Sequence, residues 1–145
     1  MNSFQLSFPE LLSEWSNLRK RIKSLPVQQQ CIAIDDWWQQ APLINHHLHW
    51  QDEQNWPDPW SLLSENTYCT LTRAVGMCYT LLMNDITDVE LVFARDINAE
   101  EHYLVLVDKP KYVMNWWPST VISNHLSSFQ IISSKSLESL KNKIK

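Results

Sequence analysis

The sequence predicts an α+β fold in which N-terminal helices and one central helix pack on a small antiparallel sheet. Apolar residues recur at helical spacing through roughly the first 83 residues. From about residue 88 onward, short runs rich in β-branched and aromatic residues are typical of strands. A length of 145 residues is enough for one domain with a substantial core.

The chain divides into four consecutive parts without a linker or an internal repeat. We expect a helical part over about 8–65, a central helix over about 67–83, an antiparallel sheet over about 88–133 and a tail over 134–145. The tail is rich in serine and lysine, so we expect it to fray. In the first part, Asp58-Pro59 has the pattern of a helix start, with Asp58 as the cap of a short helix through Leu63.

The central helix carries an apolar stripe that runs from Leu71 to Leu82. Asn66 or Thr67 can cap this helix, and either choice places Cys69 in its first turn. The backbone N–H groups of a first turn have no intrahelical acceptor and the helix dipole is positive there, which favours a thiolate. Cysteines are also among the most buried residue types, so a structural role for Cys69 stays open.

The two strongest strand patterns are close enough in sequence to form a hairpin. His102 to Val107 and Tyr112 to Trp117 flank a short turn. A four-residue turn over 108–111 pairs Val107 with Tyr112 and places Asn115 diagonally across from His102, on the same face. A three-residue turn would place Asn115 and His102 on opposite faces.

Cys69, His102 and Asn115 follow one another in the order of nucleophile, base and orienting group in papain-like thiol enzymes. In such a site, His102 would take the proton of Cys69 and Asn115 would hold the imidazole tautomer. We therefore predict these three residues as a catalytic triad.

Four short segments between Trp56 and Trp117 resemble the transglutaminase-like branch of the papain superfamily, especially its bacterial transglutaminase-like cysteine proteinases. They read WPDPWSLL, YCTLTRAVGM, HYLVLV and YVMNWW. The resemblance implies a papain/transglutaminase-like core and acyl transfer at the amide of a peptide or a glutamine-like side chain. The family usually has Gly-Asp beside the cysteine and acidic residues after it, whereas this chain reads NTYCTL over 66–71.

The substrate cleft and the oxyanion hole are predicted from residues around Cys69. Tyr68, Asn66 and Trp60 are candidates to stabilise an oxyanion. Tryptophan side chains would form the apolar walls, although a tryptophan is more often a core residue than a cleft residue; these are Trp56, Trp60, Trp116 and Trp117.

No cofactor and no metal are predicted. His46, His47 and His49 stand together, but adjacent histidines diverge on a strand or a helix, and no CxxC pair accompanies them. A chain with one glycine has no Gly-rich phosphate-binding loop.

Charge and cysteine content limit the partners and the compartment. A formal net charge of −4 argues against nucleic-acid binding, and no apolar run approaches the roughly 20 residues of a membrane span. Three irregularly spaced cysteines and an N-terminus without a secretory pattern favour the cytoplasm.

A non-enzymatic role on the same fold is the alternative to a peptide-processing or protein-processing enzyme. The chain could be a structural or assembly component that contacts other subunits, for example in a phage particle, a phage tail or a secretion apparatus. It could also be a small binding or immunity protein. The lysine-bearing tail and the missing acidic motif favour these readings.

Overall fold

The computed structural model describes residues 2–43, 48–117, 120–123 and 128–144, and it confirms the α+β fold. Short 3-10 helices η1 and η2 span Ser3–Gln5 and Glu53–Asn55. The α-helices are α1 (Phe8–Ile22), α2 (Val27–Trp38), α3 (Pro59–Glu65), α4 (Thr70–Met83) and α5 (Glu138–Ile144). The strands are β1 (Val89–Arg95), β2 (Glu101–Val107), β3 (Tyr112–Trp117), β4 (Thr120–Ser123) and β5 (Gln130–Lys135).

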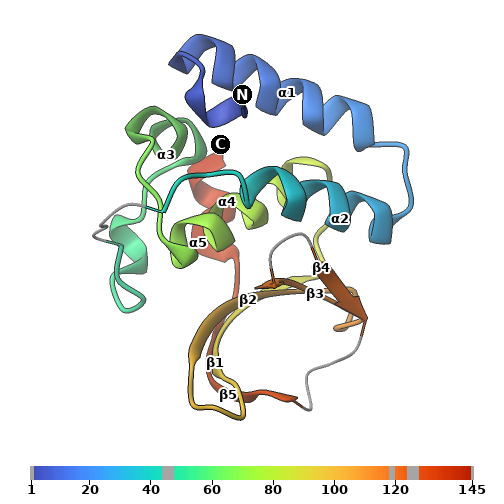
Figure 1. Ribbon diagram of the computed structural model, residues 1–145, viewed down its shortest axis with the longest axis vertical. Coiled ribbons are helices and arrows are strands. Elements are labelled where there is room, and N and C mark those ends of the chain that lie inside the picture. Colours follow the sequence, from blue (N-terminus) through green and yellow to red (C-terminus); the bar gives the residue numbers. More distant parts are fainter. Residues whose placement is uncertain (1, 44–47, 118–119, 124–127, 145) are drawn as a thin grey trace.

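The five strands form one antiparallel sheet in the order β4-β3-β2-β1-β5. Figure 1 shows that the sheet curls strongly and that the helices gather beside it, with α4 and α5 between the sheet and α1. The predicted four-residue hairpin turn is confirmed, because Val107 pairs with Tyr112. No helix in the described ranges is both long enough and apolar enough to cross a membrane.

The sheet separates two apolar clusters because side chains alternate between its faces. The helix-facing cluster joins α1, α2 and α4 to strand residues such as Leu91, Val105 and Val107. The outer-face cluster contains the intervening strand residues, which are Val92, Ala94, Leu104, Leu106 and Val113.

A threonine holds three helices together inside the first cluster. The Thr80 hydroxyl on α4 accepts hydrogen bonds from the indole N–H groups of Trp15 and Trp38, both at 3.0 Å, and donates to the Gly76 carbonyl. A Cβ at Gly76 would lie 2.5 Å from the Trp38 ring, so the glycine permits this approach of α2 to α4. These contacts fix the position of α4, at whose N-terminus Cys69 lies.

Two segments differ from the sequence-based expectations. The central helix begins at Thr70, so Cys69 is its N-cap and not a first-turn residue. The tail is ordered as far as residue 144: residues 138–144 form α5, because Leu137 and Leu140 are buried and Lys143 donates to two backbone carbonyls near η2. The predicted Asp58 cap is confirmed, because the Ser61 N–H donates to its carboxylate at 2.8 Å.

We predict that Thr80→Val lowers the free energy of unfolding by about 3 kcal/mol, because two buried indole N–H groups lose their acceptor. Urea denaturation measures this change. Thr80→Ser keeps the hydroxyl and serves as the control, with an expected loss of about 1 kcal/mol for the missing methyl group. Equal losses in the two variants would contradict the role of the hydroxyl.

Candidate functional site

A pocket of about 280 Å³ opens beside the start of α4, and we call it the α4 pocket. Helix and loop residues form one wall, and the beginning of β2 and the end of β3 form the other. Its lining residues are Gln39, Leu43, Thr70, Arg73, Glu101, His102, Tyr103, Asn115 and Trp116. Two of the three predicted catalytic residues therefore line one pocket, and the third, Cys69, directly precedes Thr70.

Cys69 is partly buried and caps α4 through its sulfur. The Thr72 N–H donates to Sγ at 3.4 Å, and the Thr72 hydroxyl lies 3.1 Å from Sγ. The Cys69 N–H donates to the Thr72 hydroxyl at 3.2 Å, which completes a capping box. The sulfur therefore lies at the positive end of the helix dipole.

His102 has a carboxylate partner that the sequence analysis did not identify. Its Nε2 lies 2.9 Å from Oδ2 of Asp96, in the connection between β1 and β2. The hydrogen bond with His102, together with two backbone N–H groups, holds the pKa of Asp96 below its ordinary value. The Phe129 ring packs against the imidazole in a T-shaped arrangement, with the ring centroids 5.5 Å apart. Asp96 thus occupies the position of an orienting group for His102.

Asn115 contacts the helices instead of His102. Its φ of 65° is left-handed, and the described pairing of β2 with β3 stops one residue earlier, at Met114. The side-chain amide donates to the carbonyls of Thr70 at 3.0 Å and Tyr103 at 2.8 Å, and it accepts from Gln39 at 3.2 Å. The expected contact between Asn115 and His102 is therefore absent from the described hydrogen bonds, although the register that we predicted is present.

The side chains of Cys69 and His102 also lie on opposite sides of the sheet. Cys69 packs against the helix-facing cluster, whereas His102 lies in the row of Leu104 and contacts the partly buried Phe129 of the outer-face cluster. The structure thus gathers the predicted triad around one pocket, but each polar group has another partner. Its catalytic role stays a prediction.

Tyr103 is the β2 side chain that faces the helices at this end of the strand. Its ring stacks on Phe93 with centroids 5.3 Å apart and lies near Trp50, and burial raises the pKa of its hydroxyl. Strand alternation in HYLVLV could have identified Tyr103, because Tyr103, Val105 and Val107 share one face.

The cleft candidates are dispersed. Tyr68 is fully buried among Phe4 and Trp38, and the Asn66 amide donates to the Phe4 carbonyl. Trp60 is partly exposed on α3, whereas Trp116 lines the α4 pocket. Trp56 is buried in the core, and the side chain of Trp117 lies outside the described residues.

The histidine cluster is only partly described. His46 and His47 lie outside the described residues. The side chain of His49 is exposed, and its backbone carbonyl accepts a hydrogen bond from the Trp56 indole.

A buried carboxylate, that of Asp35, binds two residues of the α4 pocket lining. Asp35 has no exposed surface; its Oδ1 accepts the Asn115 N–H at 2.9 Å and the Gln39 amide at 3.4 Å. Burial raises the pKa of Asp35 to about 6, against the opposing effect of the two hydrogen bonds and of Arg73. The Arg73 guanidinium donates to the side chain and carbonyl of Gln39, both at 3.0 Å, and to the Ala41 carbonyl. No sequence motif marks this network.

With this geometry in view, the architecture is that of a transglutaminase-like fold. Three solved structures of Legionella pneumophila LapG superpose on the chain with a TM-score of 0.69. The calcium-bound form is 13% identical in sequence, and the match covers 86% of this chain and 74% of that one. The two other structures, LapG and EGTA-treated LapG, are each 14% identical in sequence. Each match covers 86% of this chain and 72% of the LapG chain.

The sequence comparisons find no match. No family model matches the chain, and no curated protein matches it. The likeness to LapG confirms the predicted fold, and none of the three structures supports a phage component.

We predict that the free energy of unfolding contains a contribution from Asp35 that falls as the pH rises. The folded pKa of about 6 lies above the ordinary pKa of an aspartate, 3.8, so the contribution is fully present below about pH 4 and lost by about pH 7. Its size is on the order of 3 kcal/mol. Denaturation of the parent and Asp35→Asn at both pH values should show that the difference between them changes by this amount. A constant difference would contradict the raised pKa.

Asn115 offers a second stability test, because its backbone and side chain contribute separately. Asn115→Gly keeps the left-handed conformation but loses three side-chain hydrogen bonds, so we expect a loss of about 2–3 kcal/mol. Asn115→Ala should lose about 1 kcal/mol more, because alanine is strained at this φ. Urea denaturation measures both losses. An Asn115→Gly variant as stable as the parent would contradict the bridging role.

Proposed function

We propose that this protein is a thiol enzyme that hydrolyses or transfers the amide of a peptide or a glutamine-like side chain, with Cys69 as nucleophile. The observation that carries the proposal is the position of Cys69 as N-cap of α4, beside a pocket whose opposite wall carries His102 and Asn115. The likeness of the fold to LapG supports it.

In the proposed reaction, His102 takes the proton from the Cys69 thiol, and the thiolate attacks the carbonyl carbon of the amide. The N–H groups of the first turn of α4 would stabilise the oxyanion, since they point out of the helix end. The C–N bond then breaks, and the amine leaves with the proton from His102. Water or a second amine attacks the resulting thioester and releases the thiol.

The proposal requires two local changes. The sulfur must leave the Thr72 hydroxyl. The imidazole, which lies in the outer-face row of β2, must swing around the beginning of this strand toward the α4 pocket. The described pairing of β3 with β2 is confined to Val105–Val107, so the beginning of β2 is open toward the pocket. Because Nε2 faces Asp96, Nδ1 would take the thiol proton.

Asp96 and Asn115 would have positioning roles in this reaction. Asp96 would hold the imidazole tautomer, which is the role that the sequence suggested for Asn115. Asn115 would instead set the distance between α4 and β2 through the carbonyls of Thr70 and Tyr103.

A second candidate is a binding protein without turnover, which would hold a peptide in the α4 pocket. One specific observation favours it: the sulfur, the imidazole and the Asn115 amide each contact groups outside the proposed triad. In this case Cys69 is a helix cap and Asn115 is a structural bridge.

The rate of Cys69 alkylation by iodoacetamide distinguishes the two candidates. For a thiol enzyme, His102→Gln should slow the reaction about tenfold or more at neutral pH, because the imidazole no longer accepts the thiol proton. Intact-mass spectrometry gives the rate, and Cys69→Ala accounts for any signal from the buried Cys31 and Cys78.

His49→Gln is the matched control, since His49 is an exposed histidine outside the α4 pocket lining. This variant should react at the rate of the parent. Equal rates in the parent and His102→Gln would overturn the enzyme proposal and leave the binding protein. A fast parent would justify a screen of glutamine-containing peptides for release of ammonia or of an amine.

A further inference from the structure

On the outer side of the β1–β2 connection, one imidazole and two carboxylates converge. Asp96, Glu100 and His102 each offer one ligand atom, and these atoms all lie within 4.8 Å of one another. The three residues follow the spacing Asp-x3-Glu-x-His, which spans the turn and the beginning of β2.

The turn holds Asp96 in a fixed orientation. Its Oδ1 accepts the backbone N–H groups of Asn98 at 2.8 Å and Glu100 at 3.0 Å, and its own N–H donates to the Glu100 carbonyl at 2.9 Å. Oδ2 is thereby directed at Nε2 of His102. The side chains of Asp96 and His102 are only 17% and 19% exposed, so these two groups meet largely away from bulk water.

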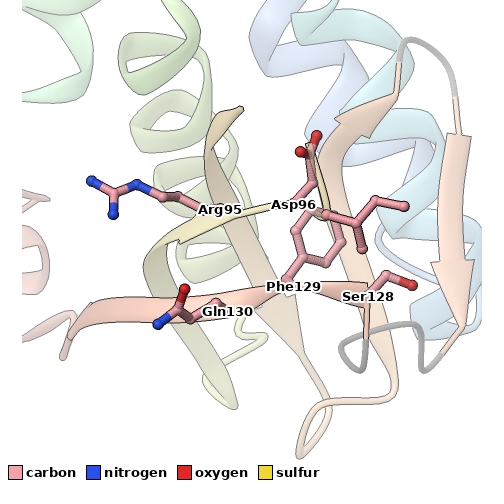
Figure 2. Close-up of a pocket in the computed structure, with 6 residues that line it drawn as sticks. Arg95, Asp96, Ser128, Phe129 and Gln130 are labelled. Atoms are coloured by element: carbon pink, nitrogen blue, oxygen red, sulfur yellow. The ribbon is translucent and has the colours of Figure 1, made fainter. Parts of the chain in front are cut away.

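Asp96 also lines a neighbouring pocket of about 320 Å³. Figure 2 shows Asp96 and the Phe129 ring close together in this pocket, with Arg95 pointing away from them. The Arg95 guanidinium pairs with the Glu101 carboxylate at 3.4 Å, on the other side of the strand from His102.

We propose that Asp96, Glu100 and His102 bind a divalent transition-metal ion, with Zn²⁺ as the representative. Imidazole nitrogen and carboxylate oxygen are ligands that such ions accept together, and three protein ligands leave a coordination position for water. The ion would replace the proton shared by Nε2 and Oδ2. Ligand distances of about 2.0–2.2 Å require these two atoms, now 2.9 Å apart, to separate by only a few tenths of an ångström.

The metal site does not rest on the proposed function. Binding of the metal ion can be measured without any substrate. A Cys69 thiol without catalytic activity would leave the affinity for the ion unchanged. If the protein is also a thiol enzyme, the ion would occupy Nε2 and hold the imidazole beside Asp96.

Isothermal titration calorimetry with Zn²⁺ on the Cys69→Ala protein tests the site without the partly exposed thiol. We expect one ion per chain and a dissociation constant that rises about tenfold or more in Glu100→Gln and in His102→Gln. Glu100 is exposed, so its substitution should leave the fold intact, which circular dichroism verifies.

Glu90→Gln and His49→Gln serve as matched controls, since both residues are exposed and lie outside the cluster. Their dissociation constants should equal that of the Cys69→Ala protein. Two results would overturn the proposal: no Zn²⁺ binding by the Cys69→Ala protein, or an affinity that Glu100→Gln or His102→Gln leaves unchanged.

Discussion

The α4 pocket depends on the hydrogen bonds of one left-handed residue, Asn115. Its side chain joins the first residue of α4 to β2 and to the end of α2, and its backbone N–H binds the buried Asp35. Since the pairing of β3 with β2 stops at Met114, this amide takes over from the β2–β3 ladder in holding the end of β3 to β2 and the helices. Toward the C-terminal end of α4, Thr80 holds this helix against α1 and α2. The position of Cys69 follows from these two sets of contacts.

Much of the fold could be predicted because it follows from local patterns. The apolar stripe of α4, the Asp58 cap and the hairpin turn each depend on residues close in sequence. The C-terminal helix could not be predicted this way. Its polar composition resembles a frayed tail, and its stability comes from Leu137 and Leu140 packing into a core built by distant segments.

The contacts in the candidate site could not be predicted from local sequence patterns. The pairing of Val107 with Tyr112 was predicted correctly, but it does not determine the φ of Asn115, which depends on carbonyls supplied by α4 and β2. The partner of His102 comes from the β1–β2 turn, so the Asp96 contact depends on how that turn folds. Buried Asp35 carries no sequence signal, because its environment is assembled from α2 and β3. Sequence order thus identified the residues around the pocket but not their partners.

The measurement that most directly tests the thiol-enzyme account is the ¹⁵N NMR spectrum of the His102 imidazole in the parent and in Cys69→Ala, recorded with a peptide aldehyde that adds to active thiols. The account predicts that the aldehyde shifts the Nδ1 resonance of the parent and leaves that of Cys69→Ala unchanged, because the ring then faces the hemithioacetal in the α4 pocket. An Nδ1 resonance that the aldehyde leaves unchanged in the parent, as in Cys69→Ala, would contradict it.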